Sequence, residues 1–119
     1  MIKILIVDDS AFTRAIHRQV IQNEGYQAVE AASGAEALDL FKKEKPDLVM
    51  MDLLMPEMDG MDVTKKILEI QPKAKIVICS TDRQKTRQAE AKQVGAVGFL
   101  TKPIDKKKMA DTLRNILGC

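Results

Sequence analysis

Residues 2–9 read Ile2-Lys3-Ile4-Leu5-Ile6-Val7-Asp8-Asp9, an apolar run that ends in two adjacent carboxylates. Such a nearly continuous run is typical of a strand buried on both faces of a parallel sheet. Other short apolar runs follow at regular intervals: Gln27–Glu30 (the weakest), Leu48–Met51, Ile76–Cys79 and Val97–Leu100. The sequence therefore predicts a sheet built from five short strands.

Amphipathic segments fill the gaps between these runs. Ser33 and Glu36 form a capping box that predicts the start of a helix, and Asp105 is the expected N-cap of the last one. Gly25 and Gly118 are expected just beyond helix ends. Strand and helix thus alternate five times, which predicts a doubly wound α/β domain with a parallel sheet.

The segment Asp82–Val94 differs from the other expected helices. Its apolar residues are only Ala89, Ala91 and Val94. A helix with so few apolar residues has little surface to bury against the sheet, so we expect it to be loosely anchored.

Composition excludes several functional classes. The net charge of +2, from 19 basic and 17 acidic residues, is too balanced to indicate binding to nucleic acid or to a membrane surface. No run approaches the roughly 20 apolar residues of a membrane span, and the N-terminus lacks the pattern of a signal peptide. Cys79 is expected to be a buried thiol and Cys119 an exposed one, in the reducing cytoplasm.

Polar residues gather where the expected strands end. The first strand ends in Asp8 and Asp9, the third in Asp52 and the fourth in Ser80, and the fifth runs on toward Lys102. In open α/β sheets, ligands bind beyond the carboxyl ends of the strands. We therefore expect three carboxylates, a hydroxyl and an amine to meet at one edge of the sheet.

Each of these residues also has an ordinary structural interpretation. Asp8 or Asp9 would serve to cap the following helix, as Ser10 would. Asp52 would serve as a loop acid, and Lys102 as a solvated surface lysine. Because these residues occupy four of the five strand ends, we favour one common binding site over a separate structural role for each residue.

The residue types then narrow the chemistry. Carboxylates held close together repel one another, so a proton or a cation must neutralise them. A site of oxygen ligands without His or Cys suits Mg²⁺. A carboxylate also serves as a nucleophile for phosphoryl groups, whose transfer requires positioning and charge neutralisation. The Lys102 ammonium and the Ser80 hydroxyl are suited to bind phosphoryl oxygens.

The same residues resemble the receiver domains of two-component response regulators. The resemblance covers essentially the whole chain, and its motifs are Val7–Ser10, Asp52 followed by Met55–Gly60, Ser80, and Lys102–Pro103. The segment Ser10–Arg14 is most similar to the single-domain chemotaxis, or CheY-like, regulators. The resemblance implies a flavodoxin-like fold with strand order 2-1-3-4-5. It also implies one receiver domain over residues 1–119, without an output domain.

The resemblance further implies a role for each matching residue. Asp52 would accept a phosphoryl group from the phosphohistidine of a histidine kinase. Asp8, Asp9 and Asp52 would hold Mg²⁺ together with the backbone carbonyl of Leu54. Lys102 would contact the phosphoryl group.

The remaining implied roles concern the response to phosphorylation. Ser80 would move to hydrogen-bond the phosphoryl group, and Phe99 would turn inward, although a simple core aromatic explains Phe99 equally well. Gly60 would be structural, and the Lys102–Pro103 bond would be cis. A downstream protein would bind the face formed by the fourth helix, the fifth strand and the last helix. Such a chain would be a monomer or weak dimer that acts only on its own phosphorylation.

One residue departs from the family pattern, and another needs its possible functional role weighed. Thr81 follows the switch hydroxyl, where the family usually has Ala or Gly, so its branched side chain is expected to narrow the phosphoryl pocket. His17 is the only histidine, and we expect a surface or half-buried helix residue rather than a metal ligand or phosphodonor.

Two rival functions remain open at this point. A phosphatase of the haloacid dehalogenase type would need an acid two residues after its nucleophile, but position 54 is Leu. A flavodoxin-like FMN carrier would need a Ser/Thr/Gly-rich phosphate loop after the first strand, where this chain has two carboxylates that would repel phosphate.

Overall fold

The computed structural model describes residues 1–81 and 85–118. Within those residues, strands and helices alternate as β1 (Lys3–Val7), α1 (Ala11–Asn23), β2 (Gln27–Ala31), α2 (Gly34–Glu44), β3 (Leu48–Asp52), α3 (Gly60–Ile70), β4 (Ile76–Ser80), α4 (Lys85–Val94), β5 (Gly98–Thr101) and α5 (Lys106–Leu117). The strands form one parallel sheet in the order β2-β1-β3-β4-β5. The predicted doubly wound, flavodoxin-like architecture is therefore confirmed.

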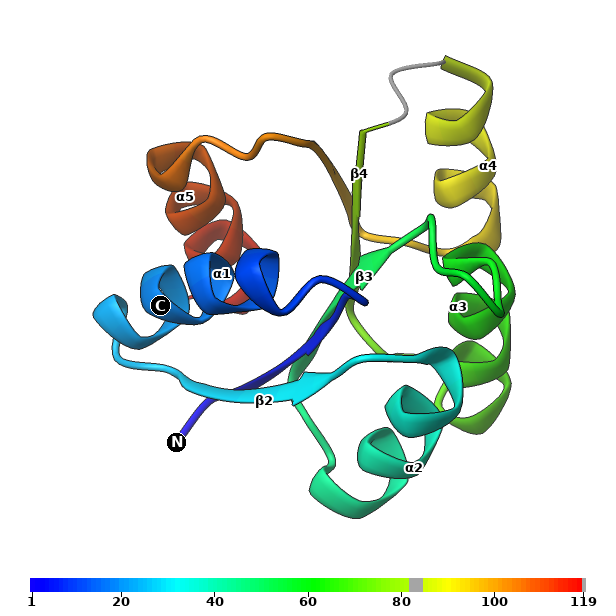
Figure 1. Cartoon of the computed structure of the whole chain (residues 1–119), viewed down its shortest axis with the longest axis horizontal. Coiled ribbons are helices and arrows are strands. Elements are labelled where there is room, and N and C mark those ends of the chain that lie inside the picture. The colour runs from blue at the N-terminus through cyan, green and yellow to red at the C-terminus, as the bar shows by residue number, and fades with distance from the viewer. Residues whose placement is uncertain (82–84, 119) are drawn as a thin grey trace.

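Two helical layers enclose the sheet. Helices α1 and α5 cover one face, and α2, α3 and α4 cover the other (Figure 1). Every residue of β3 and β4 is buried, as is β1 after its first residue. These are the strands whose sequences lack alternation, because side chains on both faces contact helices.

The predicted carboxyl ends of the two central strands are confirmed. β3 ends at Asp52 and β4 at Ser80, so the alternative interpretation of Asp52 as a loop acid is wrong. β5 begins at Gly98 instead of Val97, which is half exposed. Position in a paired strand fixes the backbone of Asp52 and Ser80, which favours a preorganised site.

The helix caps follow the predicted pattern with one exception. Ser33 Oγ accepts a hydrogen bond from Glu36 N, and Asp105 caps α5 by accepting from Lys107 N. Gly25 and Gly118 both follow helices with positive φ angles. The exception is Lys45, which ends α2 in the left-handed region at φ 48°, where the sequence offers no glycine.

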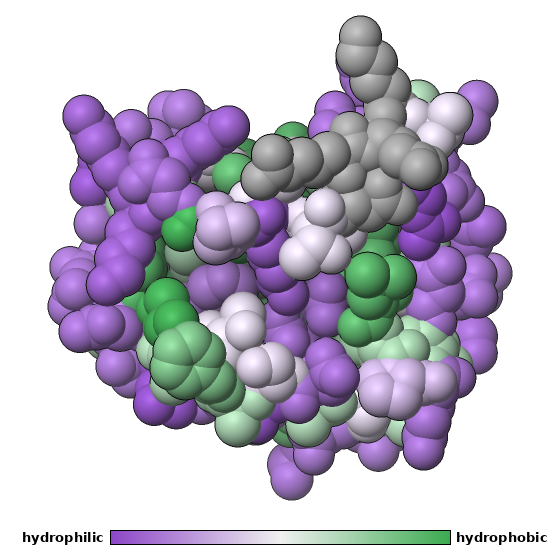
Figure 2. Space-filling view, turned by 45° about the horizontal axis from the view of Figure 1, so that its top comes forward, coloured by the Kyte–Doolittle hydropathy of each residue, from purple (hydrophilic) through white to green (hydrophobic). Residues whose placement is uncertain are grey.

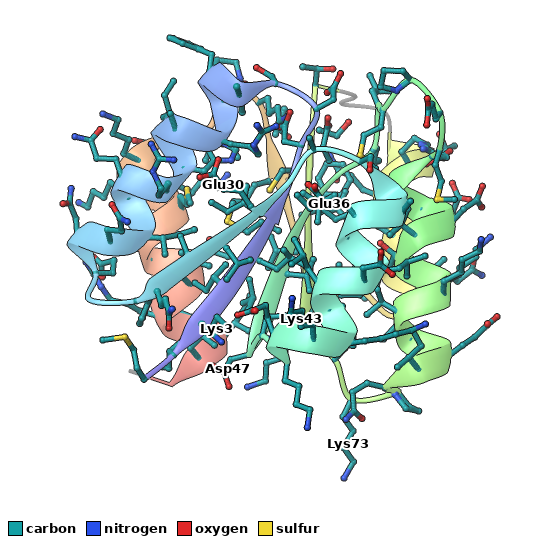
Figure 3. The ribbon with its side chains drawn as sticks, turned by 60° about the horizontal axis from the view of Figure 1, so that its bottom comes forward. Lys3, Glu30, Glu36, Lys43, Asp47 and Lys73 are labelled. Carbon is teal, nitrogen blue, oxygen red and sulfur yellow. The ribbon has the colours of Figure 1, made fainter. Side chains whose placement is uncertain are left out.

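The end of the sheet opposite the strand carboxyl ends is tied together by polar contacts. Lys3 N donates to Asp47 Oδ2 at 2.8 Å, and both residues are labelled in Figure 3. Lys3 Nζ also pairs with Glu44 at 3.0 Å. The part of the chain that the structure describes contains no helix long and apolar enough to cross a membrane. Cys79 is a buried free thiol as predicted, and burial raises its pKa to about 12, whereas Cys119 lies outside the described residues.

Candidate functional site

Three carboxylates meet at the carboxyl ends of β1 and β3. One oxygen from each of Asp8, Asp9 and Asp52 lies within 4.8 Å of the others. Asp8 and Asp52 are buried and Asp9 is exposed, so the cluster has a closed inner side and an open outer side. Figure 2 brings this end of the molecule forward and shows polar side chains between two apolar patches.

Lys102 reaches the carboxylates from the segment after β5. Its Nζ lies 2.5 Å from Asp8 Oδ2 and 3.3 Å from Asp52 Oδ1. Its backbone N–H donates to Ser80 O, which continues the β4–β5 pairing by one residue. The following Lys102–Pro103 peptide bond is cis, as the resemblance implies.

Burial and charge act in opposite directions on these groups. Burial raises the pKa of Asp52, and the neighbouring Lys102 opposes this only in part, so the charged form is less favoured than in a solvated aspartate. Burial lowers the pKa of Lys102, but its bonds to Asp8 and Asp52 outweigh that effect and raise it. Lys102 is therefore charged at neutral pH, close to a carboxylate whose own charge burial disfavours.

Local hydrogen bonds fix the backbone around Asp8. Asp8 N donates to Ala31 O on β2, and Asp8 Oδ1 accepts from Ser10 N at 2.9 Å. Ser10, rather than either acid, is the N-cap of α1, because its Oγ accepts from Thr13 N. The capping alternative for Asp8 and Asp9 is therefore wrong, and both side chains remain with the acidic cluster.

The loop between β3 and α3 folds back over Asp52. Leu54 N lies 3.4 Å from Asp52 Oδ1, and Gly60 N donates to Leu53 O at 3.0 Å. Asp59 ends the loop as the N-cap of α3. A Cβ at Gly60 would lie 2.0 Å from the backbone oxygen of Asp52, so only glycine permits this approach.

The donor set fits a hard divalent cation. Three carboxylates converge, and the metal-ligating cluster among the described residues contains neither His nor Cys. Mg²⁺ prefers oxygen ligands and binds through a few carboxylates while keeping several waters. The exposed position of Asp9 leaves the outer side of the cluster open to those waters.

The response regulator receiver domain family matches residues 4–114 of this chain. The chain belongs to that family. It is 42% identical to the chemotaxis protein CheY of Thermotoga maritima and 38% identical to that of Halobacterium salinarum. Each alignment spans 96–97% of this chain and 96% of the relative.

Solved structures agree with this assignment. The Vibrio cholerae chemotaxis protein CheY4 superposes with a TM-score of 0.92 at 32% identity, with 98% of each chain covered. The CheX–CheY–BeF₃–Mg²⁺ complex of Borrelia burgdorferi gives 0.93 at 30% identity, over 98% of this chain and 89% of the other.

This receiver is thus a phosphorylation switch of two-component signalling rather than an enzyme acting on other substrates. Its acidic triad is typical of the Mg²⁺ site of receiver domains. Such domains interact with histidine kinases and with downstream targets. The phosphatase and FMN-carrier alternatives are set aside.

The receiver's expected switch residues lie on β4 and β5. Ser80 is fully buried at the end of β4, and Thr81 beside it is exposed. Phe99 on β5 is partly buried against the core layer beneath α2, α3 and α4. Residues 82–84, the first part of the predicted Asp82–Val94 segment, lie outside the described residues, and among residues 86–94 only Ala91 is fully buried.

His17 was wrongly predicted to lie at the surface or half buried. It is only 5% exposed. Burial is the main cause that lowers its pKa, and the positive charge of nearby Lys102 lowers it further. The missed signal is the helical spacing of His17, Val20 and Ile21, which places all three on the buried face of α1. His17 lies outside the cluster of Asp8, Asp9 and Asp52.

Gly60→Ala should lower the free energy of unfolding by about 3 kcal/mol or more, because the new methyl group overlaps backbone that cannot move away. Chemical denaturation would measure the loss. Gly98→Ala is the matched control, since a Cβ there meets side chains at an ordinary 3.5 Å and should change stability much less. Equal losses for both variants would contradict the close approach at Gly60.

Proposed function

We propose that Asp52 is the residue that accepts the phosphoryl group. This proposal is supported by a comparison of the partners that the carboxylate oxygens of Asp8 and Asp52 have. Both Asp8 oxygens are engaged, by Ser10 N and by Lys102. Among the described residues, the contacts of Asp52 use Oδ1, with Leu54 N and Lys102 Nζ. Oδ2 is therefore available as a nucleophile at the end of the central strand.

The proposed transfer needs little beyond positioning. An oxygen of Asp52 attacks phosphorus, the P–N bond of a phosphohistidine breaks, and the imidazole leaves with the bonding electron pair. Bound Mg²⁺ would supply positive charge opposite the phosphoryl oxygens, held by Asp8, Asp9, Asp52 and the carbonyl of Leu54. Lys102 would leave Asp8 to contact one phosphoryl oxygen, and Ser80 would hydrogen-bond another.

The relatives support a more specific setting. The chemotaxis proteins named above match nearly end to end, which supports a receiver domain over residues 1–119 that works in chemotaxis. We infer a cytoplasmic monomer or weak dimer whose phosphodonor is a histidine kinase. Phosphotransfer profiling against the histidine kinases of the source organism tests this. One kinase should transfer far faster than the rest, and transfer from none would contradict the proposal.

The downstream partner is proposed to bind the face formed by α4, β5 and α5. A shallow hollow there is lined by Gln88, Ala91 and Lys92 of α4 together with Val97 and Phe99. α4 packs only Ala91 and Val94 of its described residues into the core, and Arg87 adds two 3.1 Å bonds to Asp59, the cap of α3. A helix held by few apolar contacts shifts at low energetic cost, which supports its role as the moving element.

Beryllofluoride with Mg²⁺, which mimics a phosphoryl group, should shift the amide NMR signals of residues 85–94 and Phe99 well beyond those of α2. A near-complete change of state would need a roughly 10⁴-fold preference of the ligand for one state. We therefore expect partial shifts, intermediate between two end states. Larger shifts in Gly34–Glu44 than in α4 would show that the face is wrongly assigned.

A further inference from the structure

Arg14 on α1 contacts the acidic cluster through the backbone rather than through a carboxylate. Its Nη1 donates to the backbone oxygen of Asp8 at 2.6 Å, and its Nε pairs with Glu30 Oε1 at 3.1 Å. The Arg14 side chain is only 16% exposed. Figure 3 shows Glu30 on β2, beneath α1.

The carbonyl of Asp8 lies beyond the sheet pairing of its own strand. β1 ends at Val7, and the pairings of β1 with both β2 and β3 stop there. Asp8 N still bonds to Ala31 O, and the bond that the described residues give the Asp8 carbonyl comes from Arg14 Nη1. The guanidinium supplies the hydrogen bond that a neighbouring strand would otherwise give.

That carbonyl belongs to the planar peptide group joining Asp8 to Asp9, so fixing it leaves the φ angle of Asp9 as the one backbone rotation between that plane and the Asp9 side chain. Within residues 1–81 and 85–118, no other side chain bonds or pairs with the Asp9 carboxylate, which is exposed. The orientation of Asp9 therefore depends on its backbone, and Arg14 adds a third bond there to those of Asp8 N with Ala31 O and of Ser10 N with Asp8 Oδ1.

Arg14 is itself held in place by Glu30, which it shares with Arg18. Arg18 Nη1 lies 2.5 Å from Glu30 Oε2, but Arg18 makes no bond to Asp8 among the described contacts. Burial raises the pKa of Glu30, yet its bonds to the two arginines outweigh that and lower it. Glu30 is thus ionised at neutral pH and offsets much of the Arg14 charge near the cation site.

We propose that Arg14 is a positioning residue for Mg²⁺, acting through the Asp8–Asp9 peptide group. The proposal rests on the proposed function, in which Asp8 and Asp9 bind the cation. The positioning role and simple electrostatics predict opposite changes in Mg²⁺ affinity when Arg14 is replaced. Removing a positive charge near a cation site should tighten Mg²⁺ binding, whereas removing a positioning contact should weaken it.

The test compares Arg14→Met with Arg18→Met by Mg²⁺ titration, using calorimetry or amide NMR shifts. Both substitutions remove one positive charge next to Glu30, but only the first removes the bond to Asp8. Arg14→Met should weaken Mg²⁺ binding roughly tenfold or more. This is the lower end of the loss in metal affinity that follows when a group orienting a metal ligand is removed. Arg18→Met should change it less than about twofold, because no ligand backbone is released.

A second readout needs no metal. Hydrogen exchange at the amides of Asp9 and Ser10 should speed up in Arg14→Met and not in Arg18→Met. Arg14→Gln, which keeps a polar head, replaces the Met variant if that does not fold. Unchanged or tighter Mg²⁺ binding in the Arg14 variants, or equal weakening in Arg18→Met, overturns the positioning role. If Asp9→Ala also leaves Mg²⁺ binding intact, the proposed cation site itself is wrong.

Discussion

Asp52→Asn should reduce phosphorylation on the order of 10³-fold or more, because losing a nucleophile removes the reaction rather than slowing it. The parent chain, given a small-molecule phosphodonor and Mg²⁺, should gain one phosphoryl group that is stable to acid and labile to base. Intact-protein mass spectrometry measures both. Asp39→Asn, at an exposed position of α2, is the matched control and should be phosphorylated like the parent.

The Asn variant should also be well folded, which separates loss of chemistry from loss of structure. Burial raises the pKa of Asp52, so ionising it at neutral pH costs stability in the folded state. Asn carries no charge and avoids that cost. The free energy of unfolding should therefore be equal or higher at pH 7, and this advantage should disappear at pH values low enough to protonate Asp52 in both states. Phosphorylation of the variant at the parent's level would refute the assignment.

Asp9→Ala should weaken Mg²⁺ binding roughly tenfold or more, equivalent to about 1.4 kcal/mol. Asp9 is the exposed member of the three-carboxylate cluster and the one without a competing side-chain partner among the described residues. Its removal therefore takes away a cation ligand without breaking an existing ion pair. Calorimetric titration measures the affinity, and phosphorylation should need correspondingly more Mg²⁺.

Asp62→Ala provides the control for that substitution. Asp62 is an exposed acid in the first turn of α3 and lies outside the cluster, so Mg²⁺ affinity should stay close to that of the parent. Addition of a chelator should stop phosphorylation of every variant. Parent-like affinity in Asp9→Ala, or phosphorylation that continues in the chelator, would contradict a Mg²⁺ site built on Asp9.

The apolar runs were sufficient to predict the sheet, since strands buried on both faces leave a continuous hydrophobic pattern. Their order was not deducible from that pattern, because a buried run does not say which strand is its neighbour. It came from the family resemblance. The convergence of Asp8, Asp9, Asp52 and Lys102 followed from a general property of parallel sheets, whose carboxyl ends share one edge.

Contacts that depend on side-chain reach were not predicted. The spacing of apolar residues along α1 indicates which face of the helix is polar. It does not indicate that the Arg14 guanidinium extends to the Asp8 carbonyl. The Arg87–Asp59 pair joins residues 28 positions apart on different elements, with no local signal. His17 is a different kind of miss, because its spacing with Val20 indicated burial and its polar character was given too much weight.

The position of the phosphoryl group in the unaltered chain tests the central assignment most directly. Borohydride reduction of the phosphorylated parent converts an aspartyl phosphate to homoserine, which peptide sequencing by mass spectrometry then locates. The three clustered acids, Asp8, Asp9 and Asp52, are all candidates by position alone. The proposed function predicts homoserine at position 52 and nowhere else. Homoserine at position 8 or 9, or at an acid outside the cluster, would contradict it.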